Sequence, residues 1–261
     1  MEIQTCGMCG GRMSLYWKRA QIIRCENCSL LKRQRLLTPE EIQKLYSTSW
    51  ESPGENRSET GGTDNWLAER YAQCLMETLG LQSLQGLRLL ELGAGRGATM
   101  KALSAVGAEV YGVEPFGYSL LKKEGFNAFR DLSELPEGMK FDGVYSIDVV
   151  EHLAEPWSTV QQLKNLLNPH GWMFVATPNA AGLNAGLRRS NWKELKRRGH
   201  LVFFRPDSLE FLLRKCDFTK YRRLNWQVDH ETKRRRPIGL LHRLLGALKL
   251  GGELRYLAFP S

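Results

Sequence analysis

Two C-x-x-C pairs near the beginning of the chain have the spacing of a metal site. Cys6 and Cys9 lie in CGMC, and Cys25 and Cys28 lie in CENC, which gives C-x2-C-x15-C-x2-C. Zinc sites with four thiolate ligands use this spacing, and each pair can form a tight turn whose backbone amides face the sulfur atoms. Four thiolates leave no coordination position for water, so we predict a structural Zn²⁺ in a ribbon over residues 1–37. The alternatives are a pair of redox dithiols or a chance pattern.

The stretch LLELGAGRGATM, residues 89–100, is a second candidate site. A short apolar run includes Glu91, and glycines then follow at alternate positions, namely Gly93, Gly95 and Gly97. Glycines let the backbone turn sharply and approach a ligand closely, and the amides at the start of the next helix then point into the site. We therefore expect a nucleotide-like cofactor. GAGRGA also satisfies the dinucleotide pattern G-x-G-x-x-G/A, which makes a nicotinamide cofactor the alternative.

Two carboxylates distinguish between these cofactors. Glu91 stands inside the turn, where it would repel a pyrophosphate but attract a cationic group such as a sulfonium amino acid. Glu114 ends the next apolar run, EVYGVEP, where it could accept hydrogen bonds from ribose hydroxyls. Taken singly, Glu91 could instead cap the following helix, and Glu114 could be a solvated strand end. Their joint spacing favours a cofactor with a cationic sulfur.

Alternating helix-like and strand-like segments must position these residues. From residue 66 onward, WLAERYAQCLMETLG has apolar residues at helical spacing and ends at Gly80. The runs GLRLLELG, EVYGVEP, FDGVYSID and GWMFVATPN read as strands, and ATMKALSAVG reads as a helix. This order predicts an α/β fold with a mostly parallel sheet, whose ligands bind at the carboxyl ends of the strands. Before it we expect a helix that begins near Thr38 and a polar loop or flap at residues 51–64.

At these motifs the sequence resembles the class I methyltransferases that use S-adenosylmethionine. Their first motif is E-x-G-x-G and their second strand ends in an acidic residue, and LLELGAGRG and YGVEP are good copies of both. Further segments of residues 86–225 are similar to the same family in the expected order, namely AFRDLSELP, FDGVYSIDVVEHLAEP and GHLVFFRPDSLEFLLRKCDF. The resemblance implies a Rossmann-like sheet in which the last strand, ELRYLAF, is antiparallel and lies at the edge.

The resemblance also implies the residues that bind the cofactor. It places Asp131 near the adenine amino group, and it gives the backbone of Leu132 a contact with the cofactor. The full expected set is Glu91, Gly93, Ala94, Gly95, Gly97, Glu114, Pro115, Asp131, Leu132 and Asp148.

Two histidines are candidate bases, because an oxygen or carbon acceptor must lose a proton when it is methylated. His152, in VVEHL, follows the fourth strand, and His200, in RRGHLVFF, lies in a segment that the resemblance places over the same pocket. A structural role in holding a loop is the alternative for both. Glu151 would orient a neighbour or belong to the cofactor pocket. We expect His170, in NPHGW, to cap the end of a helix.

The charge of the chain and one motif bear on its partners. The formal net charge of +9 favours anionic partners such as nucleic acid, phosphorylated small molecules or an acidic membrane surface. The basic segment LRRSNWKELKRRGH could clamp a phosphate or form a solvated helical face. However, the fourth strand ends in S-I-D-V rather than N-P-P-Y, which disfavours methylation of the exocyclic amines of nucleic-acid bases.

A second basic run, residues 233–236, precedes the apolar stripe of PIGLLHRLLGALKLGG. Residues 232–250 could therefore form a lid, a dimer contact or a helix on a membrane surface. No apolar stretch approaches the roughly 18 residues of a membrane span, and the first residues lack the apolar core of a signal peptide. We therefore expect a cytoplasmic protein.

These features predict a zinc ribbon at residues 1–37, a helical linker and flap at 38–85, and a methyltransferase domain at 86–261 with an insertion at 229–252. A ribbon followed by TPEEIQKLY and this core resembles bacterial methyltransferases of sugar, surface-polysaccharide and natural-product biosynthesis. The first hypothesis is O- or C-methylation of a small-molecule acceptor, such as a nucleotide-linked or lipid-linked sugar. The second is an RNA methyltransferase that docks through the ribbon and the basic segments. The third is a binding protein that retains the cofactor without catalysis.

Overall fold

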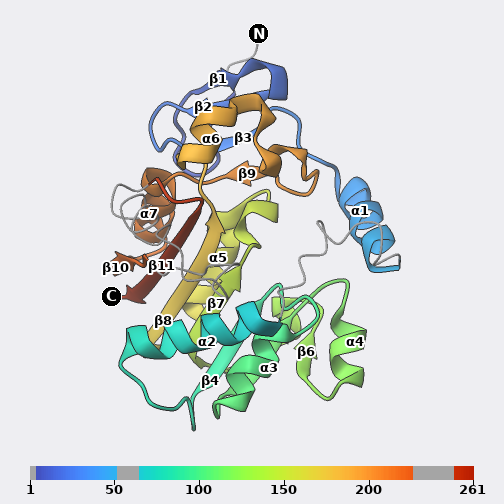
Figure 1. The fold of residues 1–261 in the computed structure, drawn as a ribbon, viewed down its shortest axis with the longest axis vertical. Coiled ribbons are helices and arrows are strands. Elements are labelled where there is room, and N and C mark those ends of the chain that lie inside the picture. Colours follow the sequence, from blue (N-terminus) through green and yellow to red (C-terminus); the bar gives the residue numbers. More distant parts are fainter. Residues whose placement is uncertain (1–3, 52–64, 226–249) are drawn as a thin grey trace, which may run out of the picture.

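The computed structural model describes residues 4–51, 65–225 and 250–261, and a seven-stranded sheet lies at the centre of this part of the chain (Figure 1). The pairs β4–β5, β5–β6, β4–β7 and β7–β8 are parallel, whereas β11 is antiparallel to both β8 and β10. The expected Rossmann-like sheet, mostly parallel with an antiparallel last strand, is confirmed. Its strands, in spatial order, are β10 (Phe218–Arg223), β11 (Glu253–Pro260), β8 (Leu167–Pro178), β7 (Phe141–Ile147), β4 (Arg88–Leu92), β5 (Glu109–Val113) and β6 (Asn127–Phe129).

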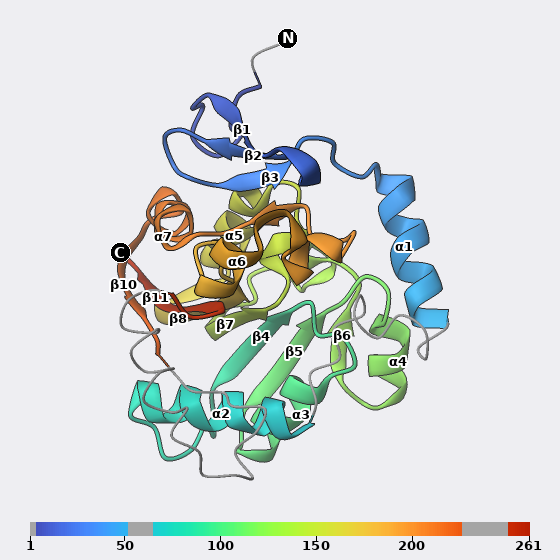
Figure 2. The same ribbon diagram turned by 45° about the horizontal axis from the view of Figure 1, so that its top comes forward.

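Helices cover both faces of this sheet (Figure 2). α5 (Pro156–Asn165) and α7 (Pro206–Lys215) pack on the face that carries Leu90 and Leu92. α2 (Asn65–Leu79), α3 (Ala98–Ala105) and α4 (Tyr118–Lys123) pack on the face that carries Leu89. Because successive side chains of a strand point to opposite faces, the apolar run of β4 is what a sheet covered on both sides requires.

Two expectations about the second half of the chain are wrong. The strand that contains ELRYLAF is not at the edge, because β11 lies between β8 and β10. β10 forms the edge instead. Its sequence FTKYRR is largely exposed and polar, so it resembles the charged segments of the chain more than a buried strand. His170 does not cap a helix, since α5 ends at Asn165 and His170 already lies inside β8. The strand begins before Gly171 because Leu167 pairs with Phe141 of β7.

The N-terminal cysteine region forms a second, smaller sheet in the order β1-β2-β3-β9. β1 (Met13–Trp17), β2 (Ile22–Cys25) and β3 (Leu31–Arg33) are consecutive, with the short 3₁₀ helix Lys18–Ala20 between the first two. β9 (Val202–Phe203) comes from the second half of the chain and follows α6 (Leu183–Arg188). Met8 and Leu30 belong to the same buried cluster as residues of α5 and α7. The ribbon is therefore packed onto the main domain, with one strand borrowed from it.

α1 (Pro39–Glu51) leads away from the ribbon toward the edge of the sheet that carries β6 (Figure 1). A capping box starts it: the Thr38 amide donates to Glu41 Oε2 at 2.9 Å, and the Glu41 amide donates to Thr38 Oγ1 at 3.3 Å. The helix expected near Thr38 thus exists.

Several sequence expectations concern residues outside the described part of the chain. They are the flap at 51–64 beyond Glu51, the basic run 233–236 with its apolar stripe, and all but the last three residues of the insertion at 229–252. Within the residues that the structure describes, no helix is long and apolar enough to cross a membrane.

Candidate active site and metal centre

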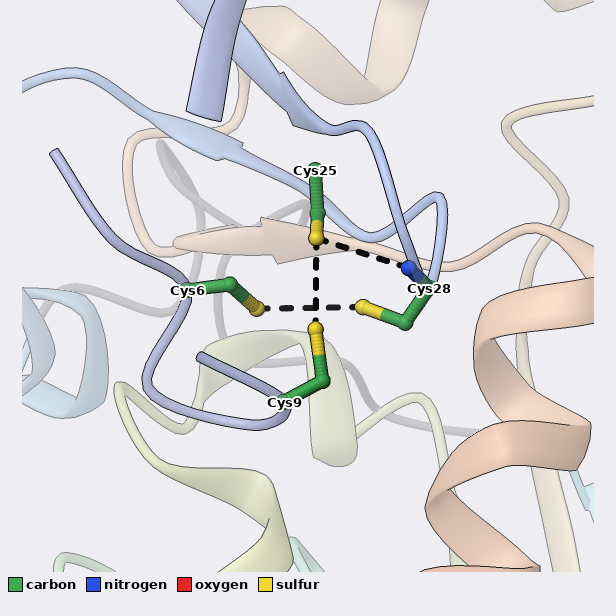
Figure 3. A group of neighbouring side chains, drawn as sticks. All are labelled: Cys6, Cys9, Cys25 and Cys28. Carbon is green, nitrogen blue, oxygen red and sulfur yellow. Dashed lines mark hydrogen bonds between the residues drawn. The ribbon is translucent and has the colours of Figure 1, made fainter. Parts of the chain in front are cut away.

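The four cysteines of the C-x-x-C pairs converge on one point of the ribbon (Figure 3). The Sγ atoms of Cys6 and Cys28 are 3.7 Å apart, those of Cys9 and Cys25 are 3.3 Å apart, and all four lie within 4.8 Å of one another. Tetrahedral zinc with Zn–S bonds of about 2.3 Å would set sulfur–sulfur distances of about 3.8 Å, close to those present. The hydrogen bond with Cys28 lowers the pKa of Cys6 to about 5, so one thiolate forms readily. This donor set fits Zn²⁺.

The glycine turn joins β4 to α3 in a conformation that requires glycine. Gly93, Gly95 and Gly97 have φ angles of 73°, 54° and 77°, in the left-handed region that other residues rarely adopt. A Cβ at Gly93 would also lie 2.3 Å from Cγ2 of Val149. The turn therefore packs directly against Val149, which follows Asp148 at the carboxyl end of β7. This contact joins the glycine turn to the segment that carries His152. Ala94, between the first two glycines, is buried.

Glu114 lies just after β5, and its carboxylate holds the glycine turn in place through backbone hydrogen bonds. Its Oε2 accepts a hydrogen bond from the Gly95 amide at 2.9 Å, and its Oε1 accepts one from the Phe116 amide at 3.1 Å. Burial raises the pKa of Glu114, while these amides oppose the shift because they stabilise the carboxylate. The carboxylate is thus fixed at the carboxyl end of its strand, where the sequence predicts a contact with ribose hydroxyls.

Glu91 does not stand open to a ligand in this structure. It is 4% exposed, and its Oε2 accepts a hydrogen bond from the Tyr145 hydroxyl at 3.0 Å. Burial raises the pKa of Glu91 well above its ordinary range, although hydrogen bonds from Tyr145, Thr99 and the Met100 amide oppose this. Thr99 and Met100 belong to the first turn of α3. These contacts favour the capping role, and a contact with a sulfonium stays a prediction.

Asp131 lies near the same edge of the sheet as Glu114, because β5 and β6 are parallel neighbours. It precedes the 3₁₀ helix Leu132–Glu134 and accepts a hydrogen bond from the Ser133 amide at 2.9 Å. Hydrogen bonds from Ser133 hold the pKa of Asp131 below its ordinary value, so it is ionised near neutral pH. Asp131 and Pro115 are both exposed. Their contacts with a cofactor stay predictions.

Glu151, His152 and His200 come together from two distant segments. The first two lie on the 3₁₀ helix Val150–His152 after β7, and His200 lies two residues before β9. The two imidazole rings are nearly perpendicular, with centroids 4.5 Å apart. Each of the three residues offers an atom within 4.8 Å of the others, so the group has the composition to hold either a proton or a metal ion.

The hydrogen bonds of this cluster are incomplete. Glu151 Oε2 accepts a hydrogen bond from Thr177 at 2.8 Å, but Glu151 Oε1 and both ring nitrogens of His200 have no hydrogen-bond partner among the described residues. Oε2 of Glu194 is 3.7 Å from Nδ1 of His200, beyond hydrogen-bond distance. Buried polar groups are normally paired, so unpaired ones mark a place where a ligand, water or ion is expected.

Burial keeps the cluster uncharged near neutral pH. It lowers the pKa of His152 to about 4 and that of His200 still further below its ordinary value, with the neighbouring imidazole and Arg197 as further causes. It raises the pKa of Glu151 well above its ordinary range. The site therefore presents two neutral imidazoles, which can each accept a proton, beside a carboxyl group whose ionisation is disfavoured.

Asp148 ends β7 with φ of 53°, in the left-handed region. Partial removal of its carboxylate from water is the main cause that raises the pKa of Asp148 to about 7, and the charge of Glu253 adds to it. The residue still exposes much of its surface, so solvent screens part of this effect. A non-glycine residue held in this conformation at a strand end is typical of functional sites.

α1 lies over the carboxyl ends of the strands and contacts both the glycine turn and the histidine cluster. The Tyr46 hydroxyl is 2.5 Å from Nδ1 of His152, and the Tyr46 ring stacks on Phe116 with centroids 5.0 Å apart. One turn later, Trp50 packs on Gly117, where an added Cβ would lie 2.3 Å from the indole. The Arg96 guanidinium of the glycine turn lies 4.8 Å from the Trp50 ring. α1 thus bridges the glycine turn, the segment after Glu114 and the histidine cluster.

Comparison with known proteins decides what this architecture belongs to. The family model described as a methyltransferase domain matches residues 64–222, more than half of the chain. The chain belongs to this family. Residues 64–222 are thus a methyltransferase domain, in agreement with the prediction from the glycine turn and the acidic strand end.

Curated relatives of the methyltransferase match over part of their length. The chain is 29% identical to the ubiquinone biosynthesis O-methyltransferase of Azorhizobium caulinodans, over 38% of this chain and 43% of the relative. It is 29% identical to the tRNA U34 carboxymethyltransferase of Trichlorobacter lovleyi, over 54% of this chain and 47% of the relative. The chain thus spans about half the length of these relatives.

Solved methyltransferases share the fold at low sequence identity. The 1,6-didemethyltoxoflavin-N1-methyltransferase of Burkholderia thailandensis, solved with 1,6-didemethyltoxoflavin and S-adenosylhomocysteine, has a TM-score of 0.55 at 18% identity and covers 90% of this chain and 97% of its own. A possible histamine N-methyltransferase of Thermotoga maritima has a TM-score of 0.54 at 15% identity and covers 84% and 98%. At such identities the likeness establishes the fold.

Sequence reasoning about this methyltransferase missed the residues of α1. Tyr46 and Trp50 lie four positions apart in LYSTSW, so they share one face of the helix, and that spacing was an available signal. It could not tell which part of the molecule this face meets, because the contact with His152 joins segments far apart in the sequence. Val149 was missed for the same reason.

Proposed function

We propose that this methyltransferase acts on a small-molecule acceptor, at an oxygen or carbon atom that must lose a proton. The carrying observation is that Tyr46 joins the segment after Glu114 to His152. Tyr46 thus lies between the segment where the ribose contact is expected and the histidine that would accept the proton. Relatives named ubiquinone biosynthesis O-methyltransferase and a structural neighbour solved with 1,6-didemethyltoxoflavin support a small acceptor.

In this proposal the glycine turn, Glu114 and Asp131 hold the cofactor, and the four cysteines hold a structural Zn²⁺. Bound S-adenosylmethionine supplies a methyl group on an electrophilic carbon. His152, which is partly exposed, takes the acceptor's proton, while His200 is fully buried and acts only through His152. The cofactor would supply this methyl group as the electrophile, and the residues of the site would hold the acceptor in line with it.

The lowered pKa of His152 favours one class of acceptor. An imidazole that is neutral near pH 7 is ready to accept a proton, but it is a weak base. Such a base is better matched to an acidified group than to an ordinary alcohol. A phenolic hydroxyl, an enol or a carbon beside a ketone, including that of a keto sugar, is therefore the acceptor class that we propose.

An RNA acceptor is the second candidate, supported by the relative named tRNA U34 carboxymethyltransferase and by one surface. Within the basic segment, Arg197 pairs with Glu194 at 3.5 Å and Trp192 is buried, so part of the segment is structural. The cations that remain exposed could contact phosphates, and they are Arg188, Arg189, Lys193, Lys196 and Arg198.

The test is to incubate the purified protein and methyl-labelled S-adenosylmethionine with an extract of cells that lack the gene. Label in small molecules or lipids supports the first proposal and identifies the pool from which the acceptor can be purified. Label in RNA, with binding that weakens steeply with salt, replaces it with the second. His152→Ala and His200→Ala, assayed at saturating cofactor, then test the proposed bases, and full activity of both variants would remove them.

A further inference from the structure

The ribbon is joined to the histidine cluster by a continuous set of hydrogen bonds. β3 of the ribbon pairs with β9, with Leu31 opposite Phe203 and Lys32 opposite Val202. The Arg33 amide continues this ladder and donates to the Leu201 carbonyl at 3.0 Å. Because Leu201 follows His200, the last strand of the ribbon reaches the residue next to the cluster.

The side chain of Arg33 then holds the segment that contains His200. Its Nε donates to the carbonyl of His200 at 2.7 Å, and its Nη2 donates to the carbonyls of Leu195 at 2.9 Å and Arg197 at 2.8 Å. A rigid guanidinium presents several donors at once, whereas the single ammonium of lysine cannot reproduce this fork. Three carbonyls of one loop are thus fixed by one side chain of the ribbon.

The same loop orients His152 from the other side. The Gly199 carbonyl lies 3.1 Å from Nδ1 of His152, and the Leu201 amide donates to the backbone carbonyl of Glu151 at 2.8 Å. If Nδ1–H donates to Gly199, the lone pair of Nε2 remains available to accept a proton. The loop position set by Arg33 therefore contributes to the tautomer and orientation of His152, together with the Tyr46 hydroxyl, which lies 2.5 Å from the same nitrogen.

The second cysteine turn leads directly into β3. Cys28 precedes Leu31 by three residues, and the intervening Ser29 has φ of 63°. The Cys25 amide donates to the Leu30 carbonyl at 2.8 Å, so the second cysteine turn and β3 are one hydrogen-bonded unit. We therefore expect a change in the cysteine turn to affect the position of Arg33.

We propose that Arg33 is a positioning residue and that the ribbon sets the geometry of the active site through it. The inference rests on the proposed function in that His152 takes the acceptor's proton. In this proposal the ribbon affects catalysis through the position of the segment that contains His200.

Arg33→Ala and Arg33→Lys test the proposal, with Lys32→Ala as the matched control. Lys32 is the preceding residue of β3, and its pairing with Val202 needs only the backbone. We expect both Arg33 variants to keep their zinc content and their affinity for S-adenosylhomocysteine. Their kcat should fall by about 10-fold to 100-fold, because a small misplacement of a reacting group has effects of this size. Lys32→Ala should retain kcat.

A readout independent of activity separates this proposal from the proposed function. Nitrogen-15 NMR of the imidazoles reports the tautomers of His152 and His200, and the signals can be assigned with a His200→Gln variant. Altered signals in Arg33→Lys support the positioning role even if His152→Ala retains activity and the proposed base fails. Unchanged imidazole signals and full kcat in Arg33→Ala would overturn the proposal. If Arg33→Ala does not fold, the lysine variant decides.

Discussion

The hydroxyl of Tyr46 and Nδ1 of His152 lie 2.5 Å apart, and they join the helix that follows the ribbon to the end of the fourth parallel strand. The Tyr46 ring also stacks on Phe116, two residues after Glu114. Tyr46 of α1 therefore contacts both the proposed base and the side of the site where the cofactor is expected. Helices that cover a site in this way exclude water and fix the orientation of reacting groups.

Tyr46→Phe should separate these two contacts. The variant keeps the ring that stacks on Phe116 but loses the hydroxyl that meets His152. We expect affinity for S-adenosylhomocysteine to change little and kcat to fall by about 10-fold, because the imidazole loses one of its two Nδ1 contacts. Tyr16→Phe, on the exposed face of the ribbon, is the control and should be neutral. Equal kcat values for Tyr46→Phe and the unaltered enzyme would exclude the Tyr46 hydroxyl from catalysis.

Gly93→Ala should damage the cofactor turn. A Cβ there meets Val149 at 2.3 Å, and the φ angle of 73° is unfavourable for alanine by about 1–2 kcal/mol. The backbone must shift, so we expect affinity for S-adenosylhomocysteine to fall by about 10-fold or more and the melting temperature to drop. Gly186→Ala in α6 is a suitable control, because no atom lies within 4 Å of its added Cβ. Calorimetric titration that gives unchanged affinity for Gly93→Ala would remove this turn from the cofactor site.

His200, which is buried, and His152, which is partly exposed, should make stability depend on pH in acid. Their folded-state pKa values are lowered from 6.5, to about 4 for His152 and further for His200. Between pH 4 and 6.5 the unfolded chain then binds more protons, so the free energy of unfolding rises with pH. The stability is present above pH 6.5 and is lost as the pH falls toward 4, by up to about 1.4 kcal/mol per pH unit for each histidine.

Buried carboxyl groups work in the opposite direction, because the raised pKa values of Glu151 and Asp148 favour folding at low pH. A comparison with His200→Gln isolates the histidine effect. Denaturant unfolding of both proteins from pH 4 to 7 should show a shallower rise of stability with pH for the variant. Parallel curves would mean that folding does not change the protonation of His200, so that His200 does not contribute to the pH dependence of stability.

The sequence was most informative where the chemistry is local. The glycine spacing of residues 93–97, the acidic end of β5 and the two C-x-x-C pairs each lie within a few residues, and the glycine turn and the cysteine cluster form as their spacing indicates. His152 and His200 were both singled out, but only the fold brings their rings together.

Features that depend on distant contacts could not be read in the same way. The pairing of β3 with β9 joins two short segments that have no pattern in common, and the guanidinium of Arg33 meets three carbonyls that carry no sequence signal. The sequence implied a strand before the 229–252 insertion but did not delimit β10, because FTKYRR has few apolar residues and little alternation. The place of Glu91 beneath the turn follows from its pairing with Tyr145 across the sheet, which alternation along β4 alone does not specify.

Cys25→Ser should remove the metal and report how far its influence reaches. Loss of one thiolate from four should release about one zinc per chain, and the ribbon should lose stability because metal binding and folding are coupled. Cys216→Ser is the control: Cys216 is also buried, and its Sγ contacts the Trp157 carbonyl at 3.5 Å, a contact that a hydroxyl can replace. Zinc is measured by atomic emission, and stability by thermal unfolding. If Cys25→Ser keeps a full equivalent of zinc, the four-thiolate site is refuted. If zinc is lost while the imidazole signals of His152 and His200 do not change, the metal stabilises only the cysteine turns. In that case β3 holds Arg33 in place without the metal.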